Sequence, residues 1–558
     1  MYISPNSVKF ASHRVLRLLR WFRATVMLFL FSALPSLAQN SVLTQHNDNS
    51  RTGQNTNETI LTTANVNTSQ FGKLFSQPVD GYIYAQPLYA SNLVIPGNGT
   101  HNVVFVATEG DSVYAFDADN NAGANANPLW MASLIDTAHG AAAGATTVNS
   151  STDIGCGDLI PQIGITSTPV IDLASGTIYV EAKSKENGAF VHRLHALNIL
   201  TGAEKAPGPV VITATVKGRG DGSSNGSLTF DALHQNNRPG LLLLNGIVYI
   251  AYASHCDIGP YHGWVFAYDA GTFAQKGVFV STPDAGLGGF WQSGAGLAAD
   301  SSGNIFSATG NGLFDSHNIP ATQFGDTLLK LALSGGKLSV VDYFTPFNQA
   351  GLRQYDADLD SGGILLLPDQ SGNHPHLLLQ AGKEGRIYLV DRDQMTANNL
   401  HYCTTCNSAR KDTQIVQEIP SALGGMWSMP AYWNGSVYFW GSGDVLKAYS
   451  ITNGTLSATP ASLSTDSYGF PGATPSISAN GNTNGIVWSL KTDAYASNGS
   501  SVLRAHNASN VANMLYSSDQ NSTRDDPGGA VKFSVPTVIN GKVYVGAVGL
   551  LSVYGLLP

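Results

Sequence analysis

Residues 246–272 read GIVYIAYASHCDIGPYHGWVFAYDAGT. A run rich in β-branched and aromatic residues is followed by a turn containing Gly and Pro, and a second such run ends at Ala-Tyr-Asp before another Gly. Runs of this composition, bounded by Gly, Pro, Asn or Asp, are typical of β-strands joined by turns. The stretch therefore predicts two antiparallel strands.

The same pattern recurs along the chain. The copies begin at residues 102, 176, 246, 303, 376, 435, 485 and 541. A further strand precedes most copies, as in SVPTVI (534–539), and another follows, as in PLWMASLI (128–135). Four strands per copy, repeated in this way, are typical of a β-propeller. We predict an all-β fold, an eight-bladed β-propeller of four-stranded antiparallel blades, from these eight copies.

The two ends of the chain predict how the ring closes. The last copy ends at Pro558 and lacks its fourth strand, whereas FGKLFSQPV (71–79) precedes the first copy without a partner. We predict that this N-terminal strand completes the last blade, which removes the open sheet edges of the ring. The propeller then spans residues 71–558, and residues 39–70 form an irregular lead-in.

The N-terminus has the pattern of a secretory signal peptide, residues 1–38. Four arginines between residues 14 and 23 precede the apolar run TVMLFLFSAL, and small residues occupy the −3 and −1 positions of a cut after Ala38. The apolar run is shorter than a membrane-spanning helix needs. We predict a secreted or periplasmic protein with no transmembrane helix after cleavage. An uncut membrane anchor is the alternative.

The composition limits the classes of partner. The chain has 558 residues, of which 43% are apolar and 12% charged, and its formal net charge is −9. This suits a large soluble globular protein, and without a basic stripe it argues against a nucleic-acid partner.

The four cysteines are candidates for disulfides in an exported protein. Cys403 and Cys406 form CTTC, and no His follows the second Cys, so a c-type haem attachment is excluded. A metal site or a thioredoxin-like redox pair lacks its expected context. We predict a local disulfide here, and Cys156 could then pair with Cys256.

Residues 353–360 read RQYDADLD, with aspartates at every second position. If this stretch is extended, the three carboxylates project from one face, and their repulsion must be relieved by water or by a cation. The sequence leaves these two possibilities open.

The repeat Val-Tyr-Val…Leu-x-Ala-Tyr-Asp-x-x-Thr-Gly resembles the pyrroloquinoline quinone (PQQ) repeat of quinoprotein alcohol dehydrogenases, which form an eight-bladed ring. The resemblance covers nearly all of the chain after residue 38 and is sharper across blades three to five. It implies PQQ with Ca²⁺ or a lanthanide as cofactors. It also implies a separate electron acceptor, because the chain has no haem motif.

Three residues match cofactor contacts of that family. The resemblance implies that Ser254, in SHCDIGPYHGWVFAYDAG (254–271), contacts the cofactor. Trp291, in GGFWQSGAGLAAD (288–300), is implied as the indole on which the quinone lies, and Lys383, in QAGKEGRIYLVDRD (380–393), as the base that contacts the quinone oxygens.

Four aspartates match the metal and catalytic positions. Asp257 stands where a metal-binding Glu stands, and Asp315, at the end of ATGNGLFD (308–315), replaces a metal-binding Asn. Asp356, after an aromatic residue, matches the catalytic Asp, and Asp358 lies at the offset where the lanthanide-dependent branch carries an extra Asp. Such carboxylates suit a hard cation, and a free one can take the proton of an alcohol.

Other features disagree with the family pattern. Its adjacent pair of cysteines is missing, and Met426, in GGMWSMPAYW (424–433), stands where a cofactor-contacting Asn is expected.

Each matched residue also has a structural alternative. Trp291 can pack between blades, Asp257 and Asp315 can cap turns, residues 353–360 can form a solvated acidic loop, and Lys383 can lie on the surface.

Two functions therefore remain. The departures slightly favour an exported PQQ-binding-like propeller with an altered site, which binds a small molecule or an envelope or extracellular protein without catalysis. The alternative is a PQQ- and metal-dependent dehydrogenase that oxidises alcohols or sugars, with Asp356 as the base.

Overall fold

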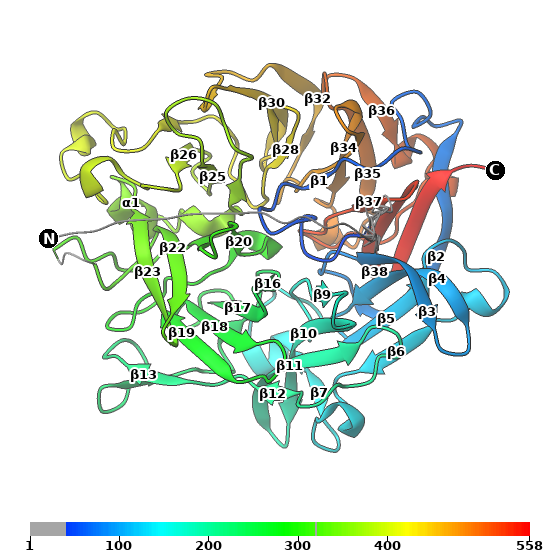
Figure 1. Cartoon of the computed structure of the whole chain (residues 1–558), viewed down its shortest axis with the longest axis horizontal. Helices are drawn as coiled ribbons and strands as arrows, with labels where there is room; N and C mark the ends of the chain where they lie inside the picture. Colours follow the sequence, from blue (N-terminus) through cyan, green and yellow to red (C-terminus); the bar gives the residue numbers. More distant parts are fainter. Residues whose placement is uncertain (1–40, 318–320) are drawn as a thin grey trace, which may run out of the picture. The chain divides into compact units, whose positions relative to one another are not determined.

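The computed structural model describes residues 41–317 and 321–558, and these residues belong to one compact unit. The predicted signal peptide, residues 1–38, lies outside the described residues. Blades of antiparallel strands follow one another around a ring in chain order (Figure 1). None of the described helices is long and apolar enough to cross a membrane.

Blades 1 to 4 contain the first half of the ring. Blade 1 has β3 (Leu88–Ile95), β4 (Gly99–Ala107), β5 (Ser112–Asp117) and β6 (Trp130–Ser133). Blade 2 has β9 (Val170–Asp172), β10 (Thr177–Glu186), β11 (Ala189–Asn198) and β12 (Val210–Val211). β7 (Thr146–Asn149) also pairs with β10, and β8 (Gln162–Ile163) pairs with β7. Blade 3 has β16 (Leu242–Leu244), β17 (Ile247–Ser254), β18 (Trp264–Asp269) and β19 (Gln275–Val280), with β15 (Gln235–Asn236) beside β17. Blade 4 has β20 (Ala298–Ala299), β21 (Ile305–Ala308), β22 (Leu328–Ser334) and β23 (Lys337–Phe344).

Blades 5 to 8 complete the ring. Blade 5 has β24 (Leu365–Leu366), β25 (Leu377–Ala381), β26 (Ile387–Asp391) and β27 (Gln417–Ile419). Blade 6 has β28 (Ala431–Trp433), β29 (Ser436–Phe439), β30 (Asp444–Thr452) and β32 (Ser462–Tyr468), with β31 (Thr455–Leu456) beside β30. Blade 7 has β33 (Ser476–Asn480), β34 (Thr483–Lys491), β35 (Val502–Asn507) and β36 (Met514–Ser517). Blade 8 has β37 (Thr537–Ile539), β38 (Lys542–Leu556) and β2 (Phe71–Tyr82).

A few short elements lie outside the blades. They are the hairpin of β13 (Thr215–Lys217) and β14 (Ser227–Thr229), the helices α1 (Gln349–Gln354) and α2 (Ser522–Asp525), and 3₁₀ turns such as η4 (Gln292–Gly294) and η5 (Leu359–Ser361).

The ring closes as the sequence predicts. β2 pairs antiparallel with β38, from Phe71 opposite Leu556 to Tyr82 opposite Val548. The last sheet has three strands instead of the predicted four, because β38 runs from Lys542 to Leu556 as one continuous strand. The N-terminal strand thus joins the two ends of the ring.

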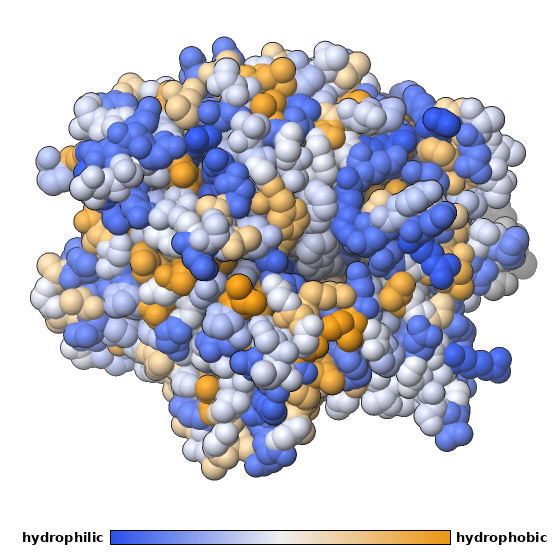
Figure 2. All heavy atoms as spheres, turned by 180° about the vertical axis from the view of Figure 1, so that it is seen from behind, coloured by the Kyte–Doolittle hydropathy of each residue, from blue (hydrophilic) through white to orange (hydrophobic). Residues whose placement is uncertain are grey.

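Apolar side chains fill the spaces between neighbouring blades. Trp130 of blade 1 packs in a core that includes residues of blade 2, and its Nε1 donates to the backbone oxygen of Ile199 at 3.0 Å. A Cβ atom at Gly202 would lie 2.5 Å from the Trp130 ring, so this turn requires glycine. On the face shown in Figure 2, apolar side chains form separate patches among polar ones.

The first described part of the lead-in, residues 41–58, forms hydrogen bonds with each blade in turn. Its hydrogen bonds join Val42 to Tyr89, Leu43 to Ile171, Asn49 to Leu243 and Ala299, Ser50 to Leu366, Thr52 to Tyr432, Gly53 to Ile477 and Asn55 to Val538, at 2.7–3.0 Å. Most bonds are made by the backbone of the inner strands, and β1 (Gln54–Asn55) pairs parallel with β33. The segment crosses the centre of the ring (Figure 1). It therefore ties the inner edges of all eight blades together.

Both predicted cysteine pairs are disulfide-bonded. Cys156 is joined to Cys256, which lies 100 residues later, and Cys403 is joined to Cys406.

Candidate functional site

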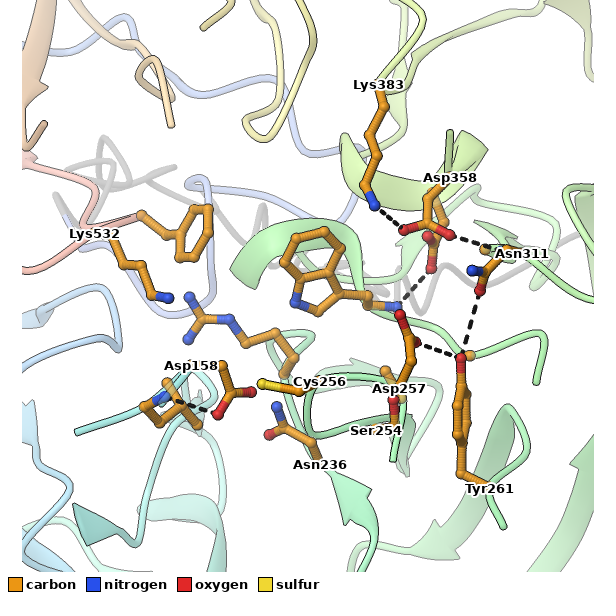
Figure 3. Close-up of a pocket in the computed structure, with 18 residues that line it drawn as sticks. Asp158, Asn236, Ser254, Cys256, Asp257, Tyr261, Asn311, Asp358, Lys383 and Lys532 are labelled. Atoms are coloured by element: carbon orange, nitrogen blue, oxygen red, sulfur yellow. Dashed lines mark hydrogen bonds and ion pairs between the residues drawn. The ribbon is translucent and has the colours of Figure 1, made fainter. Parts of the chain in front are cut away.

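A pocket is formed by loops that lead into the blades. It is lined by residues of blades 2 to 5 and 8, including Asp158, Ser254, Trp291, Lys383 and Lys532 (Figure 3). Lys383 and Asp358 lie on one side of it, and Lys532 and Asp158 lie on the other. Because segments far apart in the sequence supply its walls, the ring must close before the pocket exists.

The pocket brings together five of the seven residues predicted from the sequence. They are Ser254, Asp257, Trp291, Asp358 and Lys383. Ser254 Oγ donates to Asp257 at 3.4 Å, and Lys383 Nζ lies 5.9 Å from the centre of the Trp291 ring. The roles assigned to these residues remain predictions, but their side chains share one cavity.

The other two predicted residues do not line the pocket. Asp356 lies at its edge, where its carboxylate is 60% exposed and accepts hydrogen bonds from Lys383 at 3.0 Å and Asn311 at 3.1 Å. The Asp315 carboxylate accepts a hydrogen bond from Thr322 Oγ1 at 3.3 Å. The structure therefore does not bring Asp257, Asp315 and Asp356 together as one set of ligands.

Asn311 lines the pocket and was missed by the sequence interpretation. Its backbone N–H donates to Asp358 at 2.7 Å, and its side-chain oxygen accepts from the Tyr261 hydroxyl at 3.4 Å. Tyr261 also donates to Asp257 at 2.5 Å. Asn311 stands four residues before Asp315 in ATGNGLFD and is the residue of this segment that lines the pocket with Gly310, whereas the metal-binding role of Asp315 stays a prediction.

We call Asn311, Asp358, Asp360 and Lys383 the Lys383 end of the pocket. Lys383 forms ion pairs with Asp358 at 2.7 Å and with Asp356 at 3.0 Å. Burial opposes the charge on Lys383, but these two carboxylates outweigh it and raise its pKa. Lys383 therefore stays protonated.

Asp360 is a buried carboxylate at this end. One of its oxygens accepts from the Trp291 backbone N–H at 2.6 Å, and the other is buried without a hydrogen-bond partner. Burial and then the charge of Asp358 raise the pKa of Asp360 well above its ordinary value. A Cβ atom at Gly310 would lie 2.7 Å from Asp360 and 2.8 Å from Asp358, so glycine lets both carboxylates approach.

We call Arg238, Lys532 and Phe533 the Arg238 end. The Arg238 guanidinium is fully buried between the rings of Tyr84 and Phe533, 5.0 and 4.8 Å from their centres. Its Nη2 has no hydrogen-bond partner, and no carboxylate forms an ion pair with it among the described residues. Burial and then the Arg238 charge lower the pKa of Lys532 to about 8.

The sequence repeat explains why two aromatic side chains, Tyr84 and Phe533, flank Arg238 at this end. Tyr84 and Phe533 each stand three residues before the proline that opens an inner strand, in YAQP and FSVP. Because the position in the blade is the same, both side chains reach the same level of the ring. This spacing was a sequence signal that could have identified Phe533.

The donor set can be tested for a metal ion. Within residues 41–317 and 321–558, only Cys156, Asp158 and Cys256 form a set of three His, Cys, Asp or Glu ligand atoms within 4.8 Å of one another, and both cysteines are in a disulfide. Hydrogen bonds place the Asp257 and Asp358 carboxylates on either side of Asn311. Carboxylate and amide oxygens are the type of ligand that a hard cation such as Ca²⁺ prefers. Lys383 would have to move away from Asp358 before a cation could bind there.

Comparisons with known proteins give evidence on the fold. No protein-family model and no curated protein matches the chain. A quinohemoprotein alcohol dehydrogenase from Comamonas testosteroni has a TM-score of 0.57 at 15% identity, over 92% of this chain and 80% of that one. The quinohemoprotein alcohol dehydrogenase ADHIIG from Pseudomonas putida HK5 has a TM-score of 0.56 at 14% identity, over 93% and 80%.

This chain has a PQQ-like propeller fold. The likeness confirms the resemblance and the eight-bladed architecture predicted from the repeats. At this identity it concerns the fold alone, because propellers carry many unrelated functions. The case for a function of this PQQ-like propeller has to come from the pocket.

Proposed function

We propose that the protein binds PQQ, or a closely similar flat and polyanionic quinone, in the pocket between the Lys383 end and the Arg238 end. We further place it outside the cytoplasm, because both disulfides and the signal-peptide pattern of residues 1–38 support export. Two proteins that share this fold are named quinohemoprotein alcohol dehydrogenases, so a quinone is the first ligand to test.

The observation that carries this proposal is Arg238, which is buried, forms no ion pair among the described residues and has a guanidinium nitrogen without a hydrogen-bond partner. Burial lowers its pKa, and the more distant charges of Glu109 and Asp158 oppose this only in part, so a ligand carboxylate would supply the missing partner. Arg238 and Lys532 line one pocket wall, and Phe533 and Trp291 offer flat apolar surfaces beside them. Carboxylates on a planar ring system match this combination of cations and aromatic rings.

The residues at the other end suit the carbonyl side of such a ligand. PQQ, when bound, supplies a quinone that accepts two electrons and two protons. Lys383 lines the pocket as a cation, and when a metal takes Asp358 it would keep its hydrogen bond to Asp356 and turn its other N–H groups to the ligand. Asp257, Asn311 and Asp358 would hold Ca²⁺ or a lanthanide. Trp291 lines the pocket and would cover one face of the ligand and exclude water from it.

A second candidate function is the oxidation of an alcohol or a sugar. The position of Asp356 favours it, because this exposed carboxylate lies 3.0 Å from Lys383 and faces the edge of the pocket. A carboxylate in that place can take the proton of a substrate hydroxyl that lies next to the ligand. A separate protein must then accept the electrons.

The first test is a titration of the metal-stripped protein with PQQ, with and without Ca²⁺ or La³⁺. We expect one quinone retained per chain after gel filtration, measured by its absorbance, and more retention with metal. Asp257→Asn and Asp358→Asn should each weaken the metal-dependent part by about tenfold or more, because each removes a charged ligand.

The variant Asp315→Ala distinguishes the metal ligands predicted from the sequence, which include Asp315, from those that line the pocket, which do not. The structure predicts retention close to that of the unmodified protein, whereas a loss equal to that of Asp257→Asn would restore the set predicted from the sequence. Absence of retention with either metal would refute PQQ binding.

The pocket also predicts a pH dependence. The pKa of Lys532 is about 8, so this lysine is charged below pH 8 and loses its charge as the pH rises through that value. Affinity for a polyanion should then fall by about tenfold between about pH 7 and pH 10. Lys532→Arg should remove this fall, because arginine stays charged over the whole range. Titrations of both proteins at several pH values check it, and equal slopes would contradict it.

A further inference from the structure

One wall of the pocket contains a disulfide. Cys256 follows β17 directly and lines the pocket, where it is exposed, whereas its partner Cys156 is buried. Disulfide chemistry requires access to a sulfur atom, and here one sulfur faces the ligand site while the other is protected behind it. The proposed quinone would therefore lie next to the more accessible half of the bond.

A carboxylate stands beside both sulfur atoms. A carboxylate oxygen of Asp158 and the two Sγ atoms all lie within 4.8 Å of one another, and Asp158 lines the same pocket (Figure 3). His255 Nδ1 lies 3.5 Å from Asp158, and His255 Nε2 lies 3.0 Å from the buried Lys183. Lys183 in turn donates to the backbone oxygens of Leu233 and Gln235. These contacts hold Asp158 against the disulfide.

The backbone at Cys256 is held in an uncommon conformation. Cys256 and Asp257 have φ angles of 47° and 53°, in the left-handed region that residues other than glycine rarely adopt. Such conformations are unfavourable for residues other than glycine and persist where the surroundings enforce them, often at functional sites. The result here is that Cys256 and Asp257 both lie in the pocket wall.

From this geometry we propose that Cys156 and Cys256 form a redox-active pair that exchanges two electrons with the quinone of the proposed function. Two S–H bonds break and the S–S bond forms, two electrons pass to the quinone, and the two protons end on the quinol oxygens. Asp158 takes the proton of the buried Cys156 thiol and passes it on, so this proton is one of the two that reach the quinol. The reverse reaction opens the disulfide and regenerates the quinone.

The second disulfide provides a matched control. Cys403 and Cys406 are both buried, pack against Phe347, and do not line the pocket. Their sulfur atoms lie near the side chains of Thr405, Thr413 and Gln414, which carry no charge. The two disulfides therefore lie in one chain, but only the Cys156–Cys256 pair is reached from the pocket and has a carboxylate beside its sulfur atoms.

The test starts from the full chain, reduced with dithiothreitol and desalted without oxygen. PQQ is added, free thiols are followed by alkylation and peptide mass, and quinol is followed by its absorbance. We expect the Cys156 and Cys256 thiols to disappear about tenfold faster than those of Cys403 and Cys406, with one quinol formed per disulfide. Asp158→Asn should slow this closure by about tenfold when both proteins are compared at equal PQQ occupancy, measured by gel filtration.

Two variants separate a reaction in the pocket from a reaction in solution. Arg238→Met keeps all four thiols but should weaken PQQ binding, so its rate at low PQQ concentration should fall with its occupancy. Cys403→Ser with Cys406→Ser should leave the fast closure intact.

The outcomes distinguish this inference from the function on which it rests. PQQ retained by the protein while the Cys156 and Cys256 thiols persist would overturn the inference alone. Equal rates for both cysteine pairs, unaffected by Arg238→Met, would also overturn it. Absence of PQQ retention in both redox forms would overturn the proposed function as well.

Discussion

Replacement of Arg51 by alanine is expected to lower the free energy of unfolding by about 4 kcal/mol or more. The Arg51 side chain is fully buried and donates to the Leu297 oxygen at 2.9 Å, Thr44 Oγ1 at 2.7 Å and the Gln45 oxygen at 2.6 Å. Burial lowers the pKa of Arg51 to about 10, which still leaves it charged at neutral pH. Its loss leaves several buried acceptors without donors at the centre of the ring.

Denaturation by guanidinium chloride measures this effect, with Arg219→Ala as the control. Arg219 is exposed, and its replacement should change the free energy of unfolding by no more than about 0.5 kcal/mol. A similarly small change for Arg51→Ala would mean that the lead-in, residues 41–58, does not unfold together with the blades.

Replacement of Arg238 by methionine is expected to weaken PQQ binding by about 100-fold, which corresponds to ~3 kcal/mol. The same change should leave the ligand-free protein at least as stable as before. The reason is that a buried charge without a partner destabilises the folded state, whereas methionine fills similar space between Tyr84 and Phe533 without that cost. Weaker PQQ binding together with unchanged or higher stability would indicate that Arg238 serves ligand binding and not folding.

Equilibrium titration and thermal unfolding, both on the same preparations, check the two halves of this prediction. Arg219→Ala again serves as the control, because it removes an exposed arginine outside the pocket. If Arg238→Met destabilised the protein and left PQQ binding unchanged, Arg238 would be a structural residue, and the main support for the proposed function would be lost.

The candidate site was predictable in part. Trp291 and Lys383 were found because each stands in a recognisable glycine-containing entry to a strand, and both line the pocket. Asp315 and Asn311 lie on the same loop, and the sequence does not say which of the two turns toward the pocket. That depends on the path of a loop that packs against residues of other blades, such as Tyr261 and Asp358.

Other parts of the site gave no sequence signal that was recognised. Arg238 precedes the inner strand of blade 3 and Lys532 precedes that of blade 8, so they lie far apart in the sequence. Only closure through β2 and β38 brings blade 8 next to blade 1 and into the pocket wall. The lead-in likewise contains almost no regular strand, yet Asn49 and Ser50 reach blades that begin hundreds of residues later.

The sequence by itself determined the fold of this protein. Each blade is a local unit of about four short strands, and its apolar runs and turn residues lie within one repeat, so the pattern can be read without knowing the rest of the chain. It also predicted the local disulfide of Cys403 and Cys406 and closure by residues 71–79, and it left a Cys156–Cys256 pair as a possibility. Only the tertiary structure decided which charged side chains share the pocket and which remain unpaired. The physical reason is that burial and electrostatic pairing depend on neighbours supplied by other blades, and those neighbours are fixed only when the ring has closed.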